Sequence, residues 1–244
     1  MLEKAVIEFN KYVDNFDRTS EKINLKYQHS LAVMGLMKEL AFRLELSKED
    51  IELSGLIGLL HDIGRFVQLR ETNSFKDSIL DHAIIGADYL FKEGHIRDYI
   101  EDTKYDSIIE KAIRNHNKLK IDDGLNEREL LFSKMIRDMD KVDIYKQSAI
   151  HFEQKFNASD VTIEVLEKFK EEESIDNSIK KTKSDSVLLT LSFIFDINFN
   201  ESFDILVETD NFDLYLSTVE VDENSEKLWK KLKELCFDKI NRGI

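Results

Sequence analysis

Proline is absent from the 244 residues of the chain, which also contains only eight glycines and one cysteine. Because proline and glycine are the residues that most disfavour helix interiors, their scarcity favours a predominantly helical protein. Cys236 cannot form an intramolecular disulfide, and a single thiol cannot build a thiolate metal cluster. The longest mostly apolar run, residues 187–195, is much shorter than the roughly 20 residues of a membrane-spanning helix. The sequence therefore predicts an all-α fold without a membrane span.

Basic residues are in deficit, with 35 lysines and arginines against 49 aspartates and glutamates, which gives a net charge of −14. A surface of this charge repels polyphosphate backbones, so we expect neither a nucleic-acid polymer nor a membrane as partner. A small phosphorylated substrate still fits, because metal cations at a site outweigh the distant field. Residues 1–8 are charged and amphipathic, without the apolar core of a signal peptide, and we expect a cytoplasmic protein.

Apolar residues recur at helical spacing along most of the chain. The segment 184–197 could form a strand by periodicity alone, but its helical neighbours favour a helix. We expect a single domain, in which residues 20–150 form a helical core and residues 159–244 form a helical extension packed on it. The expected helices cover residues 2–16, 19–44, 48–60, 77–92, 100–117, 126–156, 159–173, 184–197 and 224–241.

The stretch GLLHDIGRF, residues 58–66, places His61 and Asp62 side by side at the end of an apolar helix. Neighbours on a helix point about 100° apart, so the two side chains cannot share one narrow stripe. They can nevertheless serve the same centre, because an imidazole binds one ion and a carboxylate can bind that ion and a second one. Gly64 then lets the backbone turn, and Arg65 adds a forked positive charge suited to a phosphate.

On each of five predicted helices, a residue that can bind a metal occupies a position where the hydrophobic pattern of that helix predicts an apolar side chain. Taken singly, a histidine on an apolar face is more often a hydrogen-bonded core residue than a ligand. Burying several such groups without partners costs about 1–3 kcal/mol each, however, and one or two metal ions would satisfy them together. The residues are His29, His61 with Asp62, His82, His116 and Asp140.

The order His29, His61-Asp62, Asp140 resembles the H…HD…D signature of the HD-domain metal-dependent phosphohydrolases. The stretches DHAIIGADYL around His82 and IRDMDKVDIY around Asp140 agree with it, and the resemblance covers about residues 20–150. It implies a helical core that holds a divalent ion through these four residues. In members with two ions, further histidines match His82 and His116, and Asp62 would bridge the ions.

Arg65 matches the basic residue that follows HDIG in the cyclic-dinucleotide phosphodiesterase branch of this family. The Gly-Tyr-Pro element of that branch is missing, as it must be in a chain without proline, which argues against a cyclic-dinucleotide substrate. The acidic pair that follows HD in alarmone hydrolases is missing as well.

Other polar residues near the predicted site carry weaker signals. Lys141 is a candidate for contact with the substrate, although a surface charge is its plainer interpretation. Asp143 could orient a ligand histidine, whereas we expect Asp138 to be solvated. His95 and His151 are left out of the site, the latter because it lies about 16 Å along the helix from Asp140.

The resemblance implies hydrolysis of a phosphomonoester or phosphodiester in a nucleotide or another small phosphorylated molecule, with Asp62 and Arg65 as catalytic residues. Nitrogen and oxygen ligands without sulfur favour one or two ions of Mn, Fe, Co or Ni, and are compatible with Mg or Zn. A di-iron oxygenase of the same superfamily and a metal-binding regulatory module without catalysis are the alternatives. The oligomeric state stays open, a homodimer included.

Overall fold

The computed structural model describes residues 2–243 and divides the chain into two compact units, Met1–Asp140 and Lys141–Ile244. The division falls within α8 (Glu127–His151), ten residues before the expected end of the core at residue 150. Each unit is described by itself below. That the whole chain acts as one domain stays a prediction.

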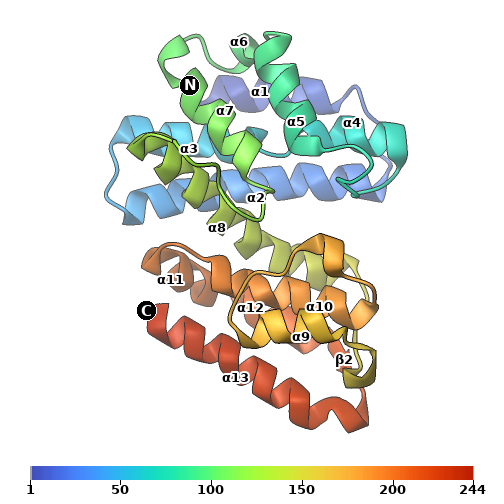
Figure 1. Cartoon of the computed structure of the whole chain (residues 1–244). Helices are drawn as coiled ribbons and strands as arrows, with labels where there is room; N and C mark the ends of the chain where they lie inside the picture. The colour runs from blue at the N-terminus through green and yellow to red at the C-terminus, as the bar shows by residue number, and fades with distance from the viewer. Residues whose placement is uncertain (1, 244) are drawn as a thin grey trace. The chain divides into compact units, whose positions relative to one another are not determined.

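The first unit consists of helices and short helical turns, which confirms the predicted all-α class (Figure 1). Helix α3 lies against α1, α2 and α7, and α4 packs on α5. The elements before α8 are α1 (Leu2–Val13), α2 (Glu21–Arg43), α3 (Lys48–Leu60), α4 (Ile63–Thr72), α5 (His82–Ala87), a π-helical turn Asp88–Lys92, α6 (Ile96–Tyr99), a 3₁₀ turn Thr103–Tyr105 and α7 (Asp106–Asn115).

Helix α3 is the central element of the first unit. Ser47 begins it as predicted, because its hydroxyl accepts the backbone N–H of Asp50 at 3.1 Å. Every residue from Leu53 to Leu60 is buried, so this helix is apolar on all sides and its C-terminal end lies in the interior. The polar pair His61-Asp62 follows there and is buried as well.

Helices α4 and α5 meet at two glycines. A Cβ atom on Gly64 would lie 2.6 Å from the backbone N of Gly86 and would also collide with the carbonyl of His82. A Cβ atom on Gly86 would in turn lie 3.0 Å from the backbone N of Gly64, so each glycine allows the close approach of the other. This contact sets the distance between the helix that begins after Asp62 and the helix that begins at His82.

The helix expected over residues 77–92 begins only at His82. Asp81 caps it, since its carboxylate accepts the backbone N–H groups of Ala83 at 2.9 Å and Ile84 at 3.2 Å. The residues before Asp81 form turns. The prediction was wrong at this end because propensity does not reveal which carboxylate serves as the cap.

The second unit contains a feature that the sequence did not indicate, a short parallel ladder in which Gln154 pairs with Val219 and Phe156 with Val221. The helix expected to reach residue 156 accordingly ends at His151, and two helices occupy a stretch to which no element was assigned. Helix 184–197 is confirmed over its first part. The elements after α8 are β1 (Gln154–Phe156), α9 (Ile163–Lys170), α10 (Lys183–Ser192), α11 (Asn200–Glu208), α12 (Asn211–Thr218), β2 (Val219–Val221) and α13 (Glu226–Gly243), with 3₁₀ turns Ala158–Asp160, Asn177–Ile179, Phe193–Asp196 and Glu223–Ser225.

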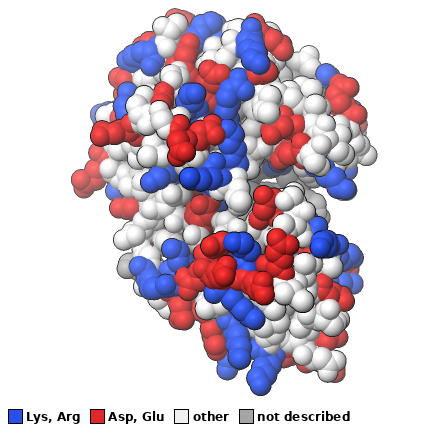
Figure 2. Space-filling view, viewed as in Figure 1, with Lys and Arg blue, Asp and Glu red and all other residues white. Residues whose placement is uncertain are grey.

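Acidic and basic side chains are interspersed over the face of the molecule that Figure 2 displays. Among residues 2–243, no helix combines the length and the apolar character that crossing a membrane would require.

Candidate metal centre

The six predicted ligands converge in the first unit, and each comes from the end or the inner face of a helix. All are buried except Asp140, whose side chain is 14% exposed. They are His29 in α2, His61 after the last residue of α3, Asp62 before α4, His82 at the start of α5, His116 after α7 and Asp140 in α8.

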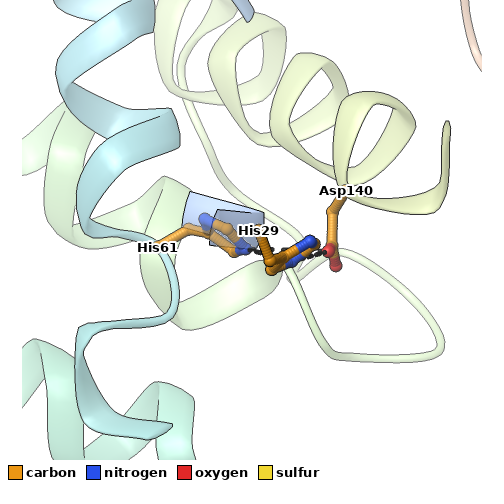
Figure 3. A group of neighbouring side chains, drawn as sticks. All are labelled: His29, His61 and Asp140. Atoms are coloured by element: carbon orange, nitrogen blue, oxygen red, sulfur yellow. Dashed lines mark hydrogen bonds and ion pairs between the residues drawn. The ribbon is translucent and has the colours of Figure 1, made fainter. Parts of the chain in front are cut away.

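Three of these side chains form a first set and point toward one another (Figure 3). His29 Nε2 lies 3.3 Å from His61 Nε2 and 3.0 Å from Asp140 Oδ1. The distance from His61 Nε2 to the same carboxylate oxygen is 3.6 Å. Two ring nitrogens and one oxygen thus surround a common point.

The second set consists of His82 and His116. Their Nε2 atoms lie 2.8 Å apart, at 3.0 Å and 3.5 Å from Asp62 Oδ1. These two residues come from α5 and from the end of α7, helices that pack on each other. The second set therefore offers two nitrogens and one oxygen of its own.

Asp62 belongs to both sets. Its Oδ1 faces the second set, whereas its Oδ2 lies 3.5 Å from His29 Nε2 and 3.6 Å from His61 Nε2. Burial by itself raises the pKa of Asp62, but the charges of Lys26 and His61 and the hydrogen bonds of His116 and His82 outweigh burial and hold that pKa well below its usual range. The carboxylate is thus ionised, with one oxygen for each set.

The same holds for Asp140, the carboxylate of the first set. Burial raises its pKa, and the hydrogen bonds and charges of His29 and His61 lower it further than burial raises it. Both aspartates are therefore in the anionic form that a metal ligand requires.

The second ring nitrogen of three histidines already has an acceptor. His61 Nδ1 donates to the carbonyl of Gly58 at 2.8 Å, and His116 Nδ1 donates to the carbonyl of Ile113 at 2.7 Å. His82 Nδ1 lies 2.6 Å from a carboxylate oxygen of Asp77. In each neutral ring the lone pair is consequently on Nε2, which faces the centre of its set.

The Nε2 lone pairs of neutral His82 and His116 face each other at 2.8 Å and repel, unless a proton or a metal cation lies between them. Metal–ligand bonds of about 2.0–2.2 Å at octahedral or tetrahedral angles place neighbouring ligand atoms roughly 2.8–3.6 Å apart. The distances within both sets fall in this range. The residues therefore fit one divalent ion in each set, and the absence of sulfur agrees with Mn, Fe, Co or Ni.

Lys26 is a neighbour of Asp62 that the sequence analysis missed. Its Nζ lies 2.7 Å from Asp62 Oδ2, and the side chain is largely buried. The residue stands three positions before His29 in α2 and so shares its face. That spacing was visible in the sequence, but a lysine on an otherwise polar part of a helix gave no reason to single it out.

Arg65 lies beside the site and also holds a loop. Its Nη1 donates to Gln68 Oε1 at 2.8 Å, to the carbonyl of Phe75 at 3.0 Å and to Asp77 Oδ1 at 2.9 Å. Its Nε lies 3.5 Å from Asp62 Oδ1 and is buried without a hydrogen-bond partner. Arg65 therefore combines a structural role at one end of the guanidinium with an unpaired N–H beside Asp62.

The remaining polar candidates have other partners. Lys141 pairs with Asp196 at 2.7 Å within the second unit, so its contact with a substrate stays a prediction. Arg137, a further cationic residue of α8, is buried and donates to the backbone carbonyls of Asn115 and Leu119. Asp143 accepts from Gln147 at 2.9 Å. Asp138 is fully buried, not solvated as expected, because this part of α8 is buried on more than one face.

The first unit is all-helical and gathers histidines and aspartates in groups that could hold a metal ion. Residues 27–145 match the family model described as the HD domain. The chain thus carries an HD domain over this stretch, which contains all six predicted ligands. No curated protein and no solved structure has a significant match to the chain.

Proposed function

We propose that the protein hydrolyses a phosphate ester of a nucleotide or another small phosphorylated molecule at a centre of two divalent ions. The observation that carries this proposal is the division of the two Asp62 oxygens between two sets of ligands. His29, His61 and Asp140 would hold one ion, and His82 and His116 the other. When bound, such ions lower the pKa of a water molecule and neutralise charge on the phosphate oxygens.

Two cationic side chains support a phosphorylated substrate. Lys26 Nζ lies beside Asp62 Oδ2, and the unpaired Nε–H of Arg65 lies beside Asp62 Oδ1. They thus flank the carboxylate shared by both ligand sets. A phosphate between the sets would receive hydrogen bonds from both cations, which stabilise the charge that grows on its oxygens in the transition state.

The protein, purified without chelators and reconstituted with each of Mn²⁺, Fe²⁺, Co²⁺, Ni²⁺, Mg²⁺ and Zn²⁺ in turn, is expected to bind two ions per chain. It is expected to release phosphate or a phosphomonoester from members of a panel of phosphorylated metabolites. Elemental analysis and product detection check this result, and His95→Ala, outside the site, is the control. One ion per chain after reconstitution would remove His82 and His116 from the centre. Oxygen uptake by the iron form without ester cleavage would instead establish the oxygenase alternative.

Replacing Arg65 by alanine is expected to lower kcat/KM about ten- to a hundred-fold, because a charge-assisted hydrogen bond worth about 1.5–3 kcal/mol is lost. Arg65→Lys should recover only part of the lost kcat/KM, since a single ammonium does not reproduce the forked donors of a guanidinium. The melting temperature should fall as well, because Nη1 no longer holds Phe75 and Asp77. Steady-state kinetics at saturating metal and thermal unfolding measure both effects.

Gln68→Met is the matched control for Arg65. Gln68 Nε2 donates to Asp77 Oδ1 at 3.0 Å and to the carbonyl of Leu80 at 2.6 Å, so it holds the same loop without facing Asp62. We expect this variant to melt earlier and, at saturating metal, to lose much less kcat/KM than Arg65→Ala does. Equal kinetic losses in the two variants would mean that Arg65 acts through the loop alone and does not touch the substrate.

A further inference from the structure

Asp77 lies in the turns between α4 and α5, five residues before His82, and the ligand sets do not include it. Three donors converge on its Oδ1. They are His82 Nδ1 at 2.6 Å, Arg65 Nη1 at 2.9 Å and Gln68 Nε2 at 3.0 Å. Arg65 Nη1 and Gln68 Nε2 can only donate in these contacts, so Asp77 Oδ1 is an acceptor that lies against the fixed charge of the guanidinium.

Asp77 Oδ1 already accepts from Arg65 and Gln68, so His82 Nδ1 is a donor to it as well. The neutral ring then carries its lone pair on Nε2, the atom that lies 3.0 Å from Asp62 Oδ1. His61 and His116 donate their Nδ1 protons to uncharged backbone carbonyls instead. An anionic acceptor makes a histidine a stronger electron donor than a carbonyl does, and it fixes the plane of the ring.

Helix α4 holds Asp77 in place. Arg65 donates to the carbonyl of Phe75, on one side of Asp77, and Gln68 donates to the carbonyl of Leu80, on the other. Both donors belong to the helix that begins directly after Asp62. The same helix thus positions the shared carboxylate and the acceptor that orients His82.

We propose that Asp77 is the positioning residue of the second ion site, where it fixes the tautomer and direction of His82 and couples this ligand to Arg65. This inference rests on the proposed two-ion centre. Asp77 contacts His82 of the second set and no ligand of the first set. Loss of Asp77 therefore lowers the affinity for the second ion and leaves the affinity for the first ion unchanged.

Titration of the metal-free full chain with Mn²⁺ tests the inference in Asp77→Asn and Asp77→Ala. We expect the affinity for the second ion to fall about 10–100-fold, the usual effect of losing a partner of a ligand histidine, with the first ion unchanged. The exchange-coupled electron paramagnetic resonance signal of a two-Mn²⁺ centre should appear only at correspondingly higher metal concentration. The asparagine variant keeps the shape of the side chain, so it tests the inference even if the alanine variant does not fold.

Asp98→Asn is the matched control, because Asp98 pairs with the exposed ring of His95 through Nδ1 at 3.1 Å, away from the ligand sets. It should bind both ions as the parent protein does. Wild-type affinity for both ions in Asp77→Asn, or equal weakening of both, would overturn the inference. A parent protein that binds two ions but cleaves no phosphate ester would overturn the proposed function and leave the role of Asp77 standing.

Discussion

Asp62→Ala is expected to lose both metal ions and all detectable hydrolysis, the largest effect of any single substitution in the site. Asp62 is the one ligand with an oxygen in each set, at 3.0 Å from His82 Nε2 and 3.5 Å from His29 Nε2. Its removal also leaves the largely buried Lys26 ammonium without its partner at 2.7 Å, in the place where a cation should bind. Elemental analysis and turnover on one preparation measure both losses.

Asp140→Ala is the control for Asp62→Ala, because it removes a carboxylate that belongs to one ligand set. Among the six predicted ligands, Asp140 pairs with His29 and His61 of the first set. Its alanine variant should lose the first ion and retain the second. Turnover at the wild-type rate in Asp62→Ala, or retention of two ions, would exclude Asp62 as a shared ligand and with it the proposed centre.

Gly64→Ala is expected to destabilise the first unit by at least about 1–3 kcal/mol, the usual cost of forcing an added methyl into a packed interior. The methyl would lie 2.6 Å from the backbone N of Gly86 and would collide with the carbonyl of His82. Backbone atoms cannot rotate aside as a flexible side chain can, so α4 and α5 must separate. Because His82 moves with α5, the affinity for the second ion should fall too. Urea unfolding of the metal-free protein and metal titration measure the two effects.

Gly35→Ala is the control for this prediction. Gly35 is an exposed residue within α2, and an added Cβ would meet nothing within 4 Å. Alanine should therefore stabilise the protein by about 0.5–1 kcal/mol through helix propensity alone. If Gly64→Ala were as stable as the parent, the close packing of α4 on α5 at this point would be refuted.

The helices and the ligand types could be predicted from the sequence. Apolar periodicity is a local pattern, and it predicted α2, α3 and α10 because each helix buries a face or its whole surface. The order His29, His61-Asp62, Asp140 identified the family before any geometry was known, and residues 27–145 match the HD domain. The short strands β1 and β2 escaped prediction, because each is three residues long and gains its partner from a distant segment.

Only the tertiary structure decided how the polar residues are paired. Lys26 reaches Asp62 across 36 residues of sequence, and Asp77 became the acceptor of His82 because Arg65 and Gln68 fix the loop that carries it. Such contacts depend on the crossing of whole helices, which no local spacing encodes. Residue type and helical phase therefore determined which side chains point inward. The packing of α4 on α5 through Gly64 decided which oxygen of Asp62 meets which histidines.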